Sequence, residues 1–117
     1  MWRKLRLRRR SDFLRLRHAG KTTQHAWMLV SVIPNDLKHN RYGFITSKTL
    51  GKAVVRNRVR RVMREAIRHY HPQLCQGFDV VFIARQKIVG KPYQEVFRHI
   101  GKLTEQAGLK KKDDPSL

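Results

Sequence analysis

The chain has few of the residues on which disulfide-bonded, zinc-binding and membrane-spanning proteins depend. Its 117 residues include one cysteine, Cys75, which excludes an internal disulfide framework and a cysteine-rich zinc site. No apolar run approaches the roughly 18 residues of a transmembrane helix. The basic N-terminus lacks the apolar stretch and the cleavage site of a secretory signal. We therefore expect a cytoplasmic protein without a membrane partner, in which Cys75 is a partly buried thiol.

Acidic residues are also scarce. The chain has 8 Asp and Glu against 27 Lys and Arg, which gives a formal net charge of +19. Charge of one sign opposes a compact monomer by self-repulsion and attracts polyanions. A small domain needs a net charge of only about 2–8 for solubility. The excess predicts a polyanionic partner, and nucleic acid is the first candidate.

Groups that could carry catalysis are poorly represented. The acidic residues are scattered, and no pair of them is typical of a two-metal nuclease centre. The six histidines show no metal-binding motif, and there is no glycine-rich phosphate loop. We therefore assign no catalytic residue and no metal ligand, and expect the chain to assist chemistry performed by a partner.

Hydrophobic periodicity and helix breakers predict a single domain over residues 1–109. Residues 1–10 are expected to be a basic arm that is mobile when free, and residues 110–117 a flexible tail. Helices are expected over 11–19, 53–70 and 92–107, and strands over 26–33, 41–47 and 78–85. The first two strands are expected to pair antiparallel, and the third, which is almost wholly apolar, to be central.

Turn and cap residues set the expected boundaries. Ser11 or Asp12 is expected to cap the first helix, and Gly20 to end it. Pro72 disfavours helical geometry at the residue before it and is expected to end the second helix. The fold class is therefore α+β, an α/β sandwich with a small central sheet of about four strands packed by helices, in the order α-β-β-(β)-α-β-α. Whether a short strand exists near residues 21–25 is left open.

The second predicted helix carries the strongest functional signal. Residues 56–68 contain six arginines, yet apolar residues recur among them at the spacing of one helix face. At about 100° per residue, five polar residues fall within roughly a third of the circumference, and two arginines flank them. The five are Asn57, Arg60, Arg61, Arg64 and Arg68, and the flanking pair is Arg56 and Arg58.

This face is better explained by nucleic acid than by simple solvation. Only Glu65 offers an acidic partner within the helix, so arginines four residues apart repel one another. The arginine fork can form two parallel hydrogen bonds with phosphate. RNA is favoured because the chain has no recognisable DNA-binding motif and because an irregular basic face suits folded RNA. Residue patterns alone leave DNA open as the alternative.

A second nucleic-acid surface is expected where aromatic and basic residues are mixed. Aromatic rings can stack unpaired bases while neighbouring cations hold the backbone. For Trp27 and Tyr42 a place in the core is an equally good explanation. The candidate residues are Phe13, Arg15, Arg17, Trp27, Arg41, Tyr42 and Lys48.

Four segments together resemble one known family. The longest, residues 47–61, reads Ser-Lys-Thr-Leu-Gly-Lys-Ala-Val-Val-Arg-Asn-Arg-Val-Arg-Arg, and Met-Arg-Glu-Ala follows at 63–66, then Arg68. Residues 5–13 read as a basic lead-in that ends in Asp-Phe, residues 41–43 are Arg-Tyr-Gly, and residues 77–85 run from Gly-Phe-Asp to Ala-Arg. Together they closely resemble the bacterial ribonuclease P protein component, over about residues 5–105.

The resemblance implies a fold, partners and roles. It implies a left-handed crossover between the sheet and the long helix, and a complex with the catalytic ribonuclease P RNA that removes the 5′ leader of precursor tRNA. The active site and most of the Mg²⁺ would belong to the RNA, so the chain would be a non-catalytic enzyme subunit without a DNA partner. By resemblance, the RNA-binding residues are Arg56, Asn57, Arg58, Arg60, Arg61, Arg64 and Arg68, and the leader-binding cleft is lined by Phe13, Arg17, Arg41 and Lys48.

The chain departs from the family pattern at three places. Thr49 follows Lys48 where the family often has a second lysine, and Arg17 occupies a position where a second aromatic is common. Ser31 occupies a strand position where the family often has an aromatic that faces the cleft. These departures predict a leader site that depends more on charge than on stacking. The alternative functions are a structural ribosomal or other RNA-binding protein without a catalytic RNA, and a protein-only nuclease.

Overall fold

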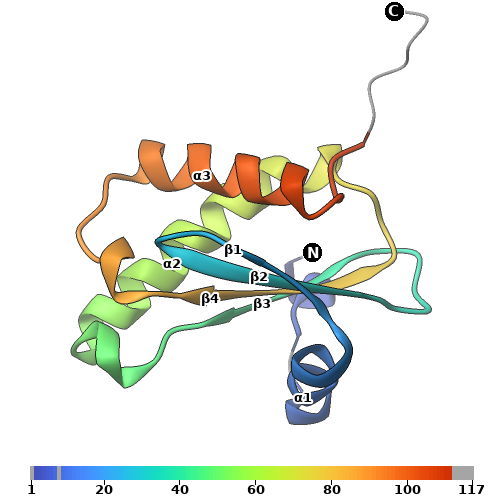
Figure 1. Ribbon diagram of the computed structural model, residues 1–117, viewed down its shortest axis with the longest axis horizontal. Coiled ribbons are helices and arrows are strands. Elements are labelled where there is room, and N and C mark those ends of the chain that lie inside the picture. Colours follow the sequence, from blue (N-terminus) through green and yellow to red (C-terminus); the bar gives the residue numbers. More distant parts are fainter. Residues whose placement is uncertain (1, 8, 112–117) are drawn as a thin grey trace, which may run out of the picture.

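The computed structural model describes residues 2–7 and 9–111, which form a four-stranded sheet packed by three α-helices (Figure 1). The helices are α1 (Arg10–Ala19), α2 (Ala53–Tyr70) and α3 (Tyr93–Gln106). The strands are β1 (Lys21–Gln24), β2 (Met28–Pro34), β3 (Arg41–Ile45) and β4 (Phe78–Ala84). Short 3-10 turns are η1 (Trp2–Leu5), η2 (Lys48–Leu50), η3 (His71–Gln73) and η4 (Gln86–Ile88). The expected α+β class and element order are confirmed, and β1 is the strand that the sequence left open.

The sheet order is β1-β2-β4-β3, with β4 paired antiparallel to β2 and parallel to β3. The expected central place of β4 is confirmed, but the expected pairing of β2 with β3 is wrong because β4 lies between them. The connection from β2 to β3 crosses the start of β4: the Asn35 N–H donates to the Gly77 carbonyl at 2.8 Å, and the Asn40 N–H to the Gln76 side chain at 3.0 Å. The parallel β3–α2–β4 connection is the crossover, and its left hand stays an expectation from the resemblance.

The sheet has two differently covered faces. Helices α2 and α3 cover one face, and α1 packs under one end of the other (Figure 1). Side chains alternate along β4, so Val80 and Phe82 enter the main core with α2 and α3, while Val81 meets Leu7 and Leu16 on the α1 side. No helix in the described ranges is long and apolar enough to cross a membrane.

The ends of α1 differ from the expected capping. The helix starts after Arg9, which makes no side-chain cap hydrogen bond, so Ser11 and Asp12 lie inside the first turn instead of capping it. Gly20 does follow the last helical residue, but with an extended backbone at φ −74°. A Cβ at Gly20 would lie 2.4 Å from the Leu16 carbonyl oxygen, so close approach rather than a left-handed turn requires glycine.

The described part of the N-terminal arm is packed onto the sheet, unlike the expected mobile segment. The side chains of Leu5 and Leu7 are buried, and the Leu7 N–H donates to the Tyr42 carbonyl at 2.8 Å. In the sequence, Leu5 and Leu7 alternate with arginines, which is a strand-like pattern that is easily overlooked in so basic a segment. After α3, Lys110 pairs with Leu74. The tail expected beyond that point lies, from residue 112, outside the described residues.

Candidate nucleic-acid interface

Helix α2 separates apolar and basic side chains onto opposite faces, as its periodicity predicts. Val59, Met63, Ala66 and Ile67 are buried against the sheet and α3, so the helix cannot detach without exposing the core. The basic face comprises Asn57, Arg58, Arg61 and Arg68, which are exposed, and Arg56, Arg60 and Arg64, which are half-buried. Its one carboxylate ion pair among the described residues, Arg68–Glu65 at 3.7 Å, is exposed and weak.

The arginines of α2 are not equivalent. Arg60 donates to the Thr46 hydroxyl at 2.6 Å and to the Asn57 side chain at 3.0 Å, so part of its donor set already fixes α2 to the end of β3. Within the described residues, the buried Nε of Arg56 has no hydrogen-bond acceptor. Arg58, Arg61 and Arg64 make no ion pair there. These three guanidinium groups are therefore available to an external phosphate.

On the opposite face of the sheet, Phe13 of α1 lies directly on the backbone of β3. A Cβ at Gly43 would come within 2.7 Å of the Phe13 ring, so only glycine leaves room for this contact. Phe13 also packs with the buried Leu7, Leu16 and Val81. The ring is half-buried, which holds it in place while part of it remains accessible.

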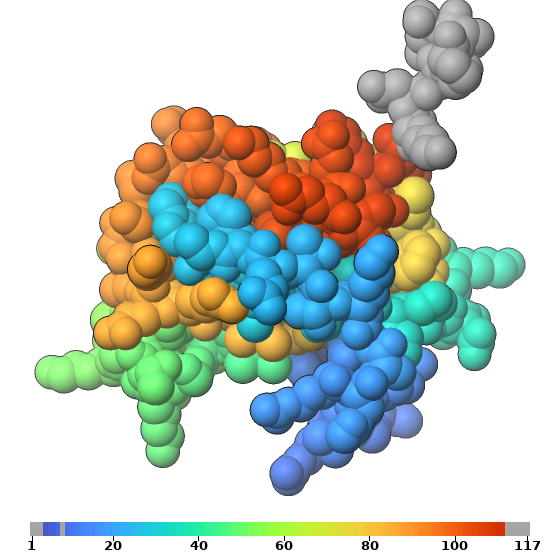
Figure 2. Space-filling view, viewed as in Figure 1, coloured from blue at the N-terminus to red at the C-terminus, as the bar shows by residue number. Residues whose placement is uncertain are grey.

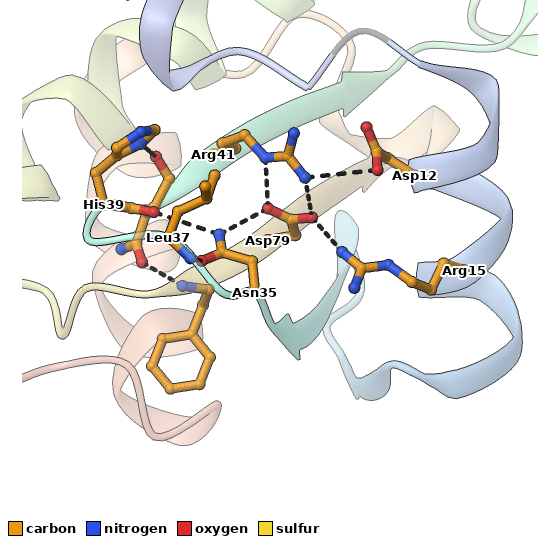
Figure 3. Close-up of polar contacts among 9 residues, drawn as sticks. Asp12, Arg15, Asn35, Leu37, His39, Arg41 and Asp79 are labelled. Atoms are coloured by element: carbon orange, nitrogen blue, oxygen red, sulfur yellow. Dashed lines mark hydrogen bonds and ion pairs between the residues drawn. The ribbon is translucent and has the colours of Figure 1, made fainter.

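Asp79 of β4 organises the charges around α1 (Figure 3). This fully buried carboxylate accepts four hydrogen bonds: from Arg41 Nε at 2.9 Å, Arg41 Nη2 at 2.7 Å, Arg15 Nη2 at 2.6 Å and Asn35 Nδ2 at 2.8 Å. Burial alone would raise the pKa of Asp79, but these hydrogen bonds and the charges of Arg41 and Arg15 lower it below its usual value. The Asp79 side chain therefore stays ionised and fixes both guanidinium groups.

Arg41 is held on two sides. Its Nη2 also lies 3.5 Å from the Asp12 carboxylate, and the hydrogen bond with Asp79 is the main reason that the pKa of Arg41 is raised. The Arg41 side chain is 24% exposed, so its guanidinium is fixed in direction by the carboxylates while part of the side chain stays accessible. Its position is thus determined by carboxylates whose role the sequence did not reveal.

The residues expected in the leader-binding cleft follow β3. Arg41 begins the strand, Phe13 covers Gly43 in its middle, and Lys48 lies exposed in η2 just after its end. Ile45 lies four residue steps along the strand from Arg41, about 13 Å at roughly 3.3 Å per residue. Arg17 is exposed one helix turn after Phe13. The structure therefore places Arg41 and Phe13 together at β3, with Arg17 exposed on α1 and Lys48 exposed in the turn after the strand.

Tyr42 and Trp27 do not belong to this surface. Tyr42 faces the α2 and α3 side with 1% of its surface exposed, and burial raises its pKa to about 12. The alternative explanation, a place in the core, is thus correct for Tyr42. Trp27 is partly buried and packs against the same core. Their aromatic character gave no means of deciding which sheet face they would occupy.

Beyond α1, the same sheet face is apolar and incompletely covered. The cross-strand register places Leu29, Ile83 and Ile45 in one row. Leu29 and Ile83 are half-buried, and Ile45 is 37% exposed. Ser31 and Thr22 lie in the next row, joined by a hydrogen bond of 2.8 Å between their hydroxyl groups. This apolar surface, formed by Leu29, Ile83 and Ile45, has room for an extended strand of unpaired bases beside Phe13 and Arg41.

Sequence comparison assigns the chain to a family. The model of the family Ribonuclease P matches residues 1–108. The chain belongs to the ribonuclease P protein family. The Ribonuclease P protein component of Chloroflexus aggregans is 42% identical over 105 residues, which cover 89% of this chain and 78% of that protein. The Ribonuclease P protein component of Caldanaerobacter subterraneus is 39% identical over 103 residues, 88% of this chain and 89% of that protein.

Solved structures of the ribonuclease P protein family share the fold. The Thermotoga maritima RNase P protein superimposes with a TM-score of 0.80 at 30% identity, over 86% of this chain and 96% of that one. The Staphylococcus aureus RNase P protein gives a TM-score of 0.85 at 25% identity, over 92% of this chain and 98% of that one. The resemblance found in the sequence is therefore confirmed, and the role of this family is processing of the tRNA 5′ end.

The residue that sequence reasoning missed is Asp79, although a signal existed: it is the one charge in the apolar run 78–84 and needed a partner there. Arg15 was included among the mixed aromatic and basic residues, but its attachment to Asp79 was not foreseen. Among the described residues, no three His, Cys, Asp or Glu side chains gather as a metal site would require.

Proposed function

We propose that this chain is the non-catalytic protein subunit of ribonuclease P, a cytoplasmic ribonucleoprotein endonuclease that removes the 5′ leader of precursor tRNA. The active site and most of the Mg²⁺ are assigned to the RNA subunit. The observation that carries this proposal is the outward face of α2, where six arginines have a single carboxylate partner among the described residues. Such a face on a helix fixed in the core presents a rigid array of guanidinium groups to phosphates.

In this proposal one surface binds the RNA subunit and the other binds the substrate. The α2 face, comprising Arg56, Asn57, Arg58, Arg60, Arg61, Arg64 and Arg68, contacts the catalytic RNA. The face beside β3 binds the single-stranded leader. Phe13 and the apolar surface of Leu29, Ile83 and Ile45 contact unpaired bases, while Arg17, Arg41 and Lys48 bind phosphates. In this assignment Arg41 is presented by Asp79 in a fixed direction, which lowers the entropy lost when it meets a phosphate.

The protein promotes cleavage by bringing two polyanions together. With a formal charge of +19 it offsets repulsion between the RNA subunit and precursor tRNA, which otherwise requires high Mg²⁺. The protein effect should therefore be largest at low Mg²⁺ and should decrease as Mg²⁺ is raised. A structural RNA-binding protein would bind RNA without this effect on cleavage.

The test is a cleavage assay at low Mg²⁺ with a bacterial ribonuclease P RNA and a 5′-labelled precursor tRNA. The wild-type protein should stimulate cleavage at the mature 5′ end, and the double variant Arg61→Ala with Arg64→Ala should stimulate it much less. Lys38→Ala, which removes one exposed charge from the loop between β2 and β3, is a control and should retain full stimulation. Absence of stimulation by the wild-type protein would overturn the proposal, and cleavage by protein alone would indicate a protein-only nuclease.

A further inference from the structure

Another basic surface lies at the β1 edge of the sheet, opposite the β3 edge where Arg60 of α2 contacts Thr46. It forms where the segment joining β1 to β2 packs against α3, as Figure 2 shows on the viewed face. Three half-buried rings meet there: His25 and Trp27 from the joining segment and His99 from α3. The His99 ring centroid lies 4.4 Å from those of both His25 and Trp27.

A chain of hydrogen bonds determines which ring nitrogen carries the proton in each of the two neutral histidines. The backbone N–H of Trp27 donates to His25 Nδ1 at 3.0 Å, so the proton of neutral His25 is on Nε2. That Nε2 lies 3.0 Å from His99 Nδ1 and donates to it. The proton of His99 is then on Nε2, which has no hydrogen-bond acceptor within residues 2–7 and 9–111. The pair therefore ends in an unused N–H donor.

Cations surround this donor with little compensation. Lys91 Nζ lies 5.1 Å from the centroid of the Trp27 ring. Burial is the main cause that lowers the pKa of both His25 and His99. The charges of His99, Lys102 and Arg85 lower the pKa of His25 further, and those of Arg98 and Lys102 lower the pKa of His99, which only Glu95 opposes. None of these four cations forms an ion pair with a carboxylate in the described part of the chain. A positive cluster without internal partners favours an anionic ligand.

We propose that His25, Trp27 and His99, together with Lys91 and Lys102, bind a phosphodiester group of an RNA strand, as an RNA contact separate from α2 and from the surface beside β3. The His99 Nε2–H donates to a phosphate oxygen, and the two lysines supply charge. The choice of RNA as the anion rests on the proposed function. A divalent metal between the histidine nitrogens is disfavoured because four cations repel it and no third ligand of the usual kind gathers with the pair in the described residues.

The site couples RNA binding to protonation. Either histidine can gain a proton only by disrupting the neutral hydrogen-bond chain beside other cations, and a bound phosphate offsets that charge. By linkage, RNA that binds here raises the titration midpoints of His25 and His99, and protonation tightens the binding of RNA. Lowering the pH from about 8 to about 6 should tighten binding at this site by at least about five-fold, the lower end of common coupling effects.

The experiment follows the imidazole and backbone amide resonances of the full-length protein by NMR during pH titrations, alone, with inorganic phosphate, and with a short single-stranded oligouridylate. The midpoints of His25 and His99 should move to higher pH with the oligonucleotide. His99→Asn should remove the pH dependence of affinity, and Lys102→Ala should weaken binding while the histidine pair stays hydrogen-bonded. His39→Asn, in the loop between β2 and β3, is the matched histidine control and should behave as the wild type.

Each contrary result has a separate meaning. If the α2 resonances respond to the oligonucleotide while His25 and His99 do not, this inference is wrong and the proposed function is unaffected. If neither surface responds, this inference is wrong, and the cleavage assay at low Mg²⁺ tests the proposed function separately. A response to inorganic phosphate but not to the oligonucleotide would show an adventitious anion only, and tight chelation of Zn²⁺ would show a metal site; both overturn the inference.

Discussion

Replacement of Asp79 by asparagine should destabilise the protein by about 3 kcal/mol at neutral pH. Asp79 accepts four hydrogen bonds, two at each carboxylate oxygen. Asparagine keeps one acceptor oxygen and turns an NH2 group toward the remaining donors, so about two charge-assisted bonds are lost at roughly 1.5–3 kcal/mol each. The lower part of that range applies because the Arg15 and Arg41 side chains are 42% and 24% exposed, so donors that lose Asp79 can form hydrogen bonds with water instead.

The effect should depend on pH in a defined direction. The pKa of Asp79 is lower in the folded protein than its ordinary value of 3.8, so the folded state favours the ionised form. The stability that this carboxylate contributes is therefore complete above about pH 4 and is lost as the pH falls through its lower folded value. The difference between wild type and Asp79→Asn should accordingly shrink below pH 4.

Urea unfolding at pH 7 and at several acidic pH values measures both quantities. Asp36→Asn, in the exposed loop after β2, is the matched control and should change the free energy of unfolding by less than about 0.5 kcal/mol. Equal stability of wild type and Asp79→Asn at pH 7, or a difference that persists unchanged into acid, would refute the role given to the Asp79 hydrogen bonds.

Further changes test the surface beside β3 and its support. Gly43→Ala should cost about 1–3 kcal/mol in unfolding free energy, because its Cβ meets the Phe13 ring, and the cost should fall in a Phe13→Leu background; additive effects in a double-mutant cycle would contradict the contact. Asn40→Ala should cost about 2–4 kcal/mol, because the Phe78 N–H and the Cys75 carbonyl lose a buried partner; an unchanged urea midpoint would contradict this. Phe13→Ala should weaken binding of precursor tRNA more than binding of leaderless tRNA, and equal loss for both would indicate a folding defect instead.

The sequence predicted what depends on local periodicity and on strong breakers. Helix α2 begins at Ala53 and ends at Tyr70, as its apolar spacing and Pro72 indicate, and β4 takes the centre of the sheet as its apolar run requires. The same periodicity placed the arginines of α2 on one face. These features follow from the order of residues within a single element, which a sequence displays directly.

Features that depend on which elements meet were not predictable in the same way. The pairing of β3 with β4 instead of β2 is a choice among strands with similar patterns. The attachment of Arg41 and Arg15 to Asp79 joins three elements, and Arg15 and Asp79 are 64 residues apart in the chain. The His25–His99 pair spans 74 residues. Such contacts are fixed by packing, and single residues carry no sign of their partner.

The most direct test of the central claim is the salt dependence of the affinity for ribonuclease P RNA, measured for wild type and for the Arg61→Ala, Arg64→Ala double variant. If both arginines bind phosphates, the double variant should bind more weakly, and its log–log salt slope should be smaller in magnitude by about 1.4–1.8. Arg61→Lys is the control that keeps the charge and should retain most of the slope. An unchanged affinity and an unchanged slope in the double variant would show that the arginine face of α2 is solvated surface and would contradict the account.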